Sequence, residues 1–217
     1  MSTRPSAAHE LRAEPGTDVR EVVVLGAFGR TGWRLVRQAR ERGWRVIAAD
    51  ERPDTAQGYR RLDARFVDEI AGSGAAVLSA LGPRRGESGA GIGDLLARLL
   101  AADGEQRIVW VLGAAVPRPG DRRGPFYSWM ARTLAARDDP AWREKTRELA
   151  LLEHSTARWT AVRPPRLRDD VDPGRYDDVD PALRLFSSIG RSTLAAFMLD
   201  CVEFDRHVRE APLVVGR

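Results

Sequence analysis

Cysteine, histidine and lysine are scarce in this sequence of 217 residues. The single cysteine, Cys201, excludes an intramolecular disulfide and a cysteine-based metal cluster. The histidines His9, His154 and His207 do not share the spacing of metal ligands, so no metal site is predicted. Lys145 is the only lysine among 35 basic residues. Arginine replaces lysine poorly where a compact, titratable ammonium is needed, and Lys145 is therefore a candidate functional residue.

Long apolar runs are also missing. The longest, residues 22–25 and 108–116, are far shorter than the roughly 20 residues that span a bilayer, so no membrane partner is predicted. Residues 1–20 are polar, contain two prolines and lack a secretory signal. We expect a loose tail there and a cytoplasmic protein. The net charge of +4 is too small to suggest a nucleic-acid partner.

The chain alternates between short apolar runs rich in β-branched residues and segments with the apolar spacing of a helix. Strands are predicted at Glu21–Leu25, Trp44–Ala49, Arg60–Leu62, Ala75–Leu81, Ile108–Leu112, Trp159–Arg163 and Pro212–Val215, and helices at Thr31–Arg42, Ala64–Ala71, Ile92–Ala102, Pro140–His154 and Ser192–Val202. This order predicts an α/β fold with a doubly wound parallel sheet, in one domain over residues 21–217 with small C-terminal elements on the substrate side. Residues 168–181 are rich in Asp and Pro and are predicted to form a solvated loop.

A glycine-rich turn follows the first predicted strand. Gly26, Gly29 and Gly32 have the spacing GxxGxxG. Gly26 permits a sharp exit from the strand, Gly29 lets backbone amides approach a pyrophosphate, and Gly32 lets the helix pack closely. The N-terminus of the next helix attracts the anion. The pattern predicts a dinucleotide site that also includes Phe28, Arg30 and Thr31. The alternative is a plain tight turn between strand and helix.

The second predicted strand is followed by Asp50. A carboxylate at this place accepts hydrogen bonds from the ribose hydroxyls and favours NAD over NADP. Glu51 adds negative charge, whereas Arg30 and Arg52 favour a 2′-phosphate. The sequence therefore leans toward NAD. The alternative is that Asp50 and Glu51 only begin a solvated loop.

The turn Gly26-Ala27-Phe28-Gly29-Arg30-Thr31-Gly32 resembles the GATGxTG turn of the atypical short-chain dehydrogenases/reductases, most closely their NmrA-like and biliverdin reductase B-like (flavin reductase-like) branch. Residues 79–82, 159–165 and 191–202 resemble further motifs of that family in the same order. The resemblance implies a Rossmann fold and an NAD(P)(H) cofactor. It also implies that Asp63 meets the adenine and that Leu81 and Gly82 lie along the cofactor.

The same resemblance bears on Lys145. The family often carries a lysine three positions before a glutamate on the helix that precedes the segment 159–165, and here these are Lys145 and Glu148. The resemblance implies that Lys145 hydrogen-bonds the nicotinamide ribose and lowers the pKa of a neighbouring hydroxyl. The alternative is an exposed charge on a helix.

Two groups that polarise a carbonyl in the family are missing. Position 141 is Ala, where the family has the Tyr of a YxxxK pair, and residues 112–115 contain no hydroxyl. Reduction of a conjugated acceptor needs such groups less than reduction of a carbonyl. Tyr127 is the remaining candidate phenol, predicted in a loop, with an aromatic anchor as the preferred alternative. Arg166 is a candidate for binding an acidic substrate, whereas Arg163 is expected to be structural.

Three functions are consistent with these features. The first is an NAD(P)-dependent oxidoreductase acting on a small conjugated or carbonyl substrate. The second is an NmrA-like protein that senses the nucleotide without catalysis. The third is a non-redox isomerase or cyclase on the same fold. The sequence leaves the oligomeric state open, a homodimer included.

Overall fold

The computed structural model describes residues 20–51, 59–83, 89, 91–102, 106–178 and 182–217. Apart from Arg20, the predicted N-terminal tail lies outside the described residues, and so does Arg52. In the described part of the chain, no helix is both long and apolar enough to cross a membrane. The same residues contain no group of His, Cys, Asp and Glu side chains arranged to hold a metal ion.

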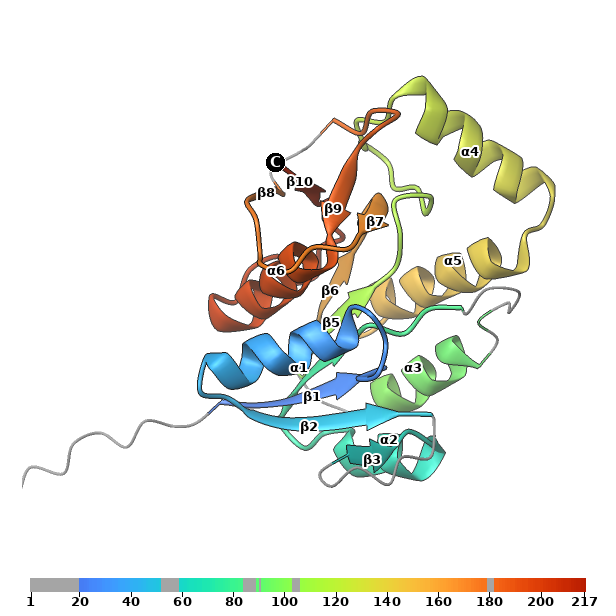
Figure 1. The fold of residues 1–217 in the computed structure, drawn as a ribbon. Helices are drawn as coiled ribbons and strands as arrows, with labels where there is room; N and C mark the ends of the chain where they lie inside the picture. The colour runs from blue at the N-terminus through green and yellow to red at the C-terminus, as the bar shows by residue number, and fades with distance from the viewer. Residues whose placement is uncertain (1–19, 52–58, 84–88, 90, 103–105, 179–181) are drawn as a thin grey trace, which may run out of the picture.

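A parallel six-stranded sheet forms the centre of the molecule (Figure 1). Its order is β3-β2-β1-β4-β5-β6, with β1 at Glu21–Leu25, β2 at Arg45–Asp50, β3 at Tyr59–Arg61, β4 at Ala76–Ser79, β5 at Arg107–Val111 and β6 at Arg158–Val162. All five pairings between neighbouring strands are parallel. The direction of winding reverses between β1 and β4, the switch point at which ligands bind in such sheets. The predicted doubly wound Rossmann-like fold is therefore confirmed.

Helices cover both faces of the sheet because successive strand residues point to opposite sides. On one face, Val23, Leu25 and Trp110 pack with α2 (Ala64–Ile70), α3 (Ile92–Ala101) and α5 (Pro140–Glu153). On the other face, Val22 and Val24 pack with α1 (Gly32–Glu41) and α6 (Arg191–Glu203). Cys201 is a fully buried member of this second cluster.

Small elements in the C-terminal part lie beside the sheet. β7 (Arg166–Arg168) pairs with β9 (Ser188–Gly190), and β8 (Tyr176–Asp177) pairs with β10 (Val215–Gly216). The prediction of an unbroken loop over residues 168–181 is therefore wrong in part. The predicted last strand, Pro212–Val215, is also displaced, since only Val215 belongs to β10. These pairings join segments distant in sequence, which local patterns do not reveal.

Helix α4 (Pro125–Ala136) is the one described helix that the sequence pattern did not predict. It begins at Pro125, in the first helical turn where proline is favoured. Its large apolar side chains Phe126 and Trp129 are exposed, and its buried residues are Tyr127 and Ala131. In Figure 1 it stands apart from the central sheet.

Candidate functional site

The glycine turn joins β1 to α1 at the switch point of the sheet. Gly26 has φ +77°, a backbone conformation that favours glycine. At Gly32, an added Cβ would lie 1.9 Å from the carbonyl oxygen of Gly26, so no side chain fits. At Gly29, an added Cβ would approach only that same oxygen, at 3.0 Å. Gly32 thus faces the packed backbone of the turn, whereas at Gly29 no other atom of the described residues, apart from its chain neighbours, lies within 4 Å of the position of a Cβ.

The N-terminus of α1 is suited to an anion. No side chain caps it, and its first turn carries no acidic residue. No residue of the first helical turn therefore offsets the partial positive charge of the helix end. The N-cap residue Thr31 and the residues before it belong to the predicted dinucleotide site. The binding of a pyrophosphate at this turn stays a prediction, which the uncapped helix end supports.

Asp50 is buried at the end of β2, with 5% of its surface exposed. Its Oδ2 accepts a hydrogen bond from the amide of Phe28 at 2.9 Å. The Phe28 ring stacks on Tyr59 of β3, with ring centroids 4.5 Å apart. Asp50 therefore contacts the glycine turn directly and is not part of a solvated loop, whereas Glu51 is exposed.

Asp63 and Arg30 have protein partners of their own. Asp63 caps α2, with its Oδ1 accepting the amide of Phe66 at 2.9 Å. Its contact with an adenine stays a prediction. The guanidinium of Arg30 is largely exposed and lies 3.6 Å from the carboxylate of Asp169.

Arg34, on α1, contacts the glycine turn and was not predicted from the sequence. Its buried guanidinium donates to the carbonyl of Arg30 at 2.6 Å, to the carbonyl of Asp170 at 2.9 Å and to Ser192 Oγ at 3.0 Å. It therefore fixes the glycine turn against the N-terminus of α6. Its position in a helical repeat gave no signal, because its partners Asp170 and Ser192 lie more than 130 residues away.

Lys145 lies at the same end of the sheet and is 9% exposed. Its Nζ lies 2.8 Å from Glu148 Oε2, 3.2 Å from the carbonyl oxygen of Val111 and 3.3 Å from that of Leu81. The alternative of an exposed helix charge is wrong. Leu81 is buried and Gly82 exposed in the segment that follows β4, where they were predicted to lie along the cofactor. The catalytic role of Lys145 stays a prediction.

Tyr127 lies on α4 and not in a loop, which corrects the prediction of its local structure. It is 4% exposed and packs with Ala114, Leu183 and Leu213. Its hydroxyl lies 3.5 Å from the carbonyl oxygen of Ser187. Burial raises the pKa of Tyr127, partly offset by a hydrogen bond from the backbone of Arg166. The packing favours the aromatic anchor over a proton donor.

Arg163 and Arg166, on either side of two prolines, differ in burial and in their contacts. Arg163 is 3% exposed, and both of its terminal nitrogens lie 2.7 Å from the carboxylate of Asp121. It also donates to the carbonyls of Val116 and Ala211. Its expected structural role is confirmed. Arg166 is exposed on β7, so its side chain is accessible to a ligand.

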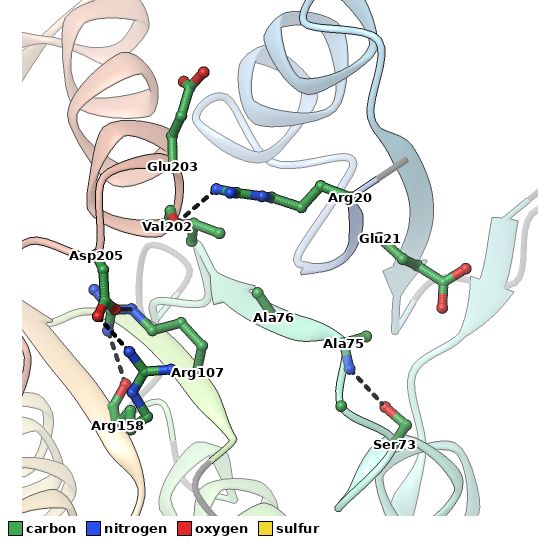
Figure 2. Close-up of a pocket in the computed structure, with 11 residues that line it drawn as sticks. Arg20, Glu21, Ser73, Ala75, Ala76, Arg107, Arg158, Val202, Glu203 and Asp205 are labelled. Carbon is green, nitrogen blue, oxygen red and sulfur yellow. Dashed lines mark hydrogen bonds and ion pairs between the residues drawn. The ribbon is translucent and has the colours of Figure 1, made fainter. Parts of the chain in front are cut away.

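A second feature lies at the opposite end of the sheet. A cavity of about 530 Å³ is lined by residues at the N-terminal ends of the strands, Arg20, Arg107 and Arg158 among them (Figure 2). Glu21, Glu203 and Asp205 line it as well and balance these charges. Arg20 donates to the carbonyl of Val202 at 2.7 Å, and Arg158 is paired with Asp205. This cavity is separate from the predicted cofactor site.

Comparison with solved structures relates the fold to known proteins. A candidate NADH-flavin reductase from Streptococcus pneumoniae TIGR4 is similar, with 20% identity, a TM-score of 0.67, and coverage of 91% of this chain and 100% of that one. ChuY, an anaerobilin reductase from Escherichia coli O157:H7, has 17% identity and a TM-score of 0.67 over 90% and 97%. A candidate epimerase from Bacteroides thetaiotaomicron has 22% identity and a TM-score of 0.69 over 91% and 97%. At these identities the likeness establishes the fold.

Sequence comparison gives a more specific result. No curated protein matches the sequence. A family model for NAD(P)H-binding domains matches residues 26–205, a range that begins at the first glycine of the turn and ends just beyond α6. Since this match covers well over half of the sequence, the chain belongs to the NAD(P)H-binding family.

Proposed function

We propose that this protein is an NAD(P)H-dependent reductase of the atypical short-chain type that acts on a small conjugated substrate. The glycine turn at the switch point carries the proposal. At Gly32 the turn has no room for a side chain, and the helix that follows begins without a side-chain cap. When bound there, the cofactor would supply a hydride. The protein would bind and orient it and exclude water from the reacting face.

We assign each part of the cofactor to a part of the site. The pyrophosphate would bind the backbone of Gly29, Arg30, Thr31 and Gly32, next to Gly26 and Phe28. Asp50 and Asp63 would contact the adenosine half. Leu81 and Gly82 would lie along the cofactor toward Lys145.

The choice of a conjugated substrate follows from the residues near the nicotinamide end. Residues 112–115 offer no hydroxyl, position 141 is Ala, and the Tyr127 hydroxyl is buried with a raised pKa. The charge that arrives with a hydride is delocalised in a flavin or a quinone, and water can then supply the proton. The names of two neighbours, a flavin reductase and an anaerobilin reductase, agree with such a substrate. Arg166 would bind an acidic group on it.

We further propose that NADH is preferred over NADPH. The buried carboxylate of Asp50 at the end of β2 would accept ribose hydroxyls and repel a 2′-phosphate. Arg30, which could pair with that phosphate, lies beside the carboxylate of Asp169. The local charges of the described residues therefore favour the cofactor without the phosphate.

Calorimetric titration with NADH and with NADPH tests the proposal, followed by assays of NADH oxidation with flavin and quinone acceptors. We expect micromolar affinity for NADH and turnover with at least one acceptor. In Gly29→Asp, a carboxylate against the pyrophosphate should weaken binding by about 100-fold or more. Ala150→Asp, exposed on α5, adds the same charge away from the turn and serves as the control.

Other results would select another function. Binding without turnover would favour the nucleotide-sensing protein. Activity that persists after all nucleotide is removed would favour the non-redox isomerase or cyclase. Equal binding by Gly29→Asp and the unaltered protein would refute the assignment of the turn as the cofactor site.

A further inference from the structure

Lys145 is the centre of a buried polar cluster, which we call the Lys145 cluster and which consists of Lys145, Glu148 and Trp110. Glu148 is completely buried one helical turn after Lys145 on α5. Its Oε2 accepts hydrogen bonds from Lys145 Nζ at 2.8 Å and from Trp110 Nε1 at 2.5 Å. Trp110, on β5, is also completely buried. The ammonium is therefore held by a carboxylate that is itself held by the sheet.

The contacts of the ammonium account for all of its protons. An ammonium has three N–H donors, and Nζ of Lys145 lies within hydrogen-bond distance of three oxygens, those of Glu148, Val111 and Leu81. Val111 ends β5, and Leu81 follows β4. Lys145 thus ties α5 to the C-terminal ends of two neighbouring strands, and each of its protons already has an acceptor in the protein.

The contact with Leu81 connects the cluster to the glycine turn. The chain leaves the sheet after Ala80, whose amide still bonds to Leu25 of β1. Beyond it, the carbonyl of Leu81 is held by Lys145. The Leu81 side chain approaches Gly26 so closely that its Cδ2 would lie 3.1 Å from a Cβ at Gly26. Leu81 therefore stands between the ammonium and the turn.

The cluster is costly in terms of stability. Burial raises the pKa of Glu148, although the ammonium of Lys145 acts against this shift. Oε1 of Glu148 has no hydrogen-bond partner among the described residues. A buried ion pair stabilises a fold little compared with apolar side chains of the same volume, and an unpaired carboxylate oxygen adds to the cost. This cost indicates a purpose other than stability.

We propose that Lys145 and Glu148 are positioning residues for the cofactor wall formed by Leu81 and Gly82. Glu148, held by Trp110, directs the ammonium to the carbonyl of Leu81, and this contact fixes the distance between the wall and the glycine turn. Lys145 acts through Leu81 and gives no proton to the substrate. The inference rests on the proposed function insofar as the nucleotide binds between these two segments.

Hydrogen exchange of the cofactor-free protein tests the positioning directly, without any ligand. In Lys145→Met we expect faster exchange in a peptide covering residues 76–83 and unchanged exchange in β2. Arg143→Met is the matched control, because Arg143 is exposed on the same helix and carries the same charge. Unchanged exchange over residues 76–83 in Lys145→Met would overturn the proposal.

Steady-state kinetics and titration supply the second measurement. Loss of one charge-assisted hydrogen bond to the wall should weaken NADH binding about tenfold in Lys145→Met. With NADH saturating, kcat should fall less than the NADH affinity does, because no proton donor is lost. Glu148→Gln should show a change of the same kind, as expected of a residue that acts through Lys145. A drop in kcat of about 100-fold at unchanged NADH affinity would instead make Lys145 a proton donor and refute the inference.

A further variant separates loss of folding from loss of positioning. Lys145→Met leaves Glu148 as an unpaired buried charge, whereas the double variant Lys145→Met/Glu148→Leu removes both charges. We expect the double variant to unfold cooperatively and still to exchange faster over residues 76–83. Exchange restored to that of the unaltered protein would overturn the inference. If the unaltered protein binds neither NADH nor NADPH, the proposed function fails. The exchange data still show whether Lys145 holds the segment of Leu81 and Gly82 in place.

Discussion

At the scale of single residues, Asp50 combines two tasks. Its carboxylate accepts the amide of Phe28 and so holds the glycine turn against β2. The same charge lies where an adenosine ribose would approach in the proposed site. A neutral side chain of the same shape can still accept the Phe28 amide but carries no charge toward the ribose. A substitution can therefore separate the two roles.

The substitution Asp50→Asn should change cofactor preference more than stability. The amide oxygen of Asn can still accept the Phe28 N–H, while the negative charge that repels a 2′-phosphate is gone. We expect the ratio of NADPH to NADH affinity to rise about tenfold, measured by titration with both nucleotides. Asp68→Asn, at an exposed position on α2, is the control, since it removes the same charge outside the proposed site. An unchanged ratio in Asp50→Asn would contradict the assigned role.

Residues also differ in how far the sequence predicts them. The glycine turn and Asp50 were predicted because their geometry depends on a short segment and on the end of the next strand. The contacts of Arg34 with Ser192 and of Lys145 with Val111 were not, because these partners come from segments that meet only in the folded chain. Tyr127 was placed in a loop because α4 lacks the apolar periodicity that marks a packed helix.

At the scale of elements, the N-terminus of α6 depends on a residue far from it in the chain. Asp170 accepts hydrogen bonds from the amides of Ser192 at 2.6 Å and Thr193 at 3.3 Å, and from Thr193 Oγ1 at 2.9 Å. Burial alone would raise the pKa of Asp170, but these hydrogen bonds lower it overall. The cap also explains why Gly190 precedes the helix, since a Cβ there would lie 1.7 Å from Asp170 Oδ2.

The lowered pKa of Asp170 predicts a pH-dependent contribution to stability. A carboxyl whose pKa is lower in the folded state stabilises the protein above its unfolded pKa, here about 4. This contribution is lost as pH falls through the folded pKa. Asp170→Ala should therefore lower the free energy of unfolding by about 1–2 kcal/mol at pH 7. In urea titrations, the difference from the unaltered protein should shrink below about pH 4.

The control for this prediction is Asp172→Ala, which removes an exposed carboxylate from the same segment. Its free energy of unfolding should match that of the unaltered protein both at pH 7 and below about pH 4. A difference between Asp170→Ala and the unaltered protein that stays constant from pH 7 to well below 4 would show that the carboxylate does not act as a charged cap.

The elements of the central sheet were predicted more fully than those beside it. Apart from β3, whose residues are Tyr-Arg-Arg, each strand from β1 to β6 is a mainly apolar run that pairs with its neighbours in the regular order of a doubly wound sheet. β7, β8 and β10 contain only two or three residues, and each acquires its structure from one distant partner. A two-residue strand carries too few side chains for an alternating pattern to appear.

At the scale of the whole molecule, the two ends of the sheet carry different sets of polar residues. The C-terminal ends carry the glycine turn, Asp50 and the Lys145 cluster. The N-terminal ends carry Arg107, which is 7% exposed and joins β5, β6 and α6 (Figure 2). Its guanidinium donates to the carbonyls of Arg158 at 2.7 Å, Cys201 at 2.8 Å and Arg206 at 2.7 Å, and to Thr160 Oγ1 at 2.9 Å.

We expect Arg107→Met to lower stability and leave cofactor affinity unchanged. The substitution removes the donor of four hydrogen bonds that join β5, β6 and α6, which should cost about 3 kcal/mol of unfolding free energy. Arg45→Met, at an exposed position at the start of β2, should cost less than about 0.5 kcal/mol. Urea unfolding measures both, and titration of the folded variants with NADH checks the site. A large loss of NADH affinity in folded Arg107→Met would show that the two ends are coupled.

The burial of Lys145 and Cys201 has a consequence for chemical labelling. Each is the only residue of its type in the sequence, and they lie on opposite faces of the sheet. Burial raises the pKa of the Cys201 thiol to about 12, so it is almost entirely in the unreactive protonated form at neutral pH. Thiol-directed and amine-directed reagents would therefore modify these two side chains mainly when the covering helix opens. Their two labelling rates would time the opening of α6 and of α5 separately, in the natural sequence and without an engineered probe.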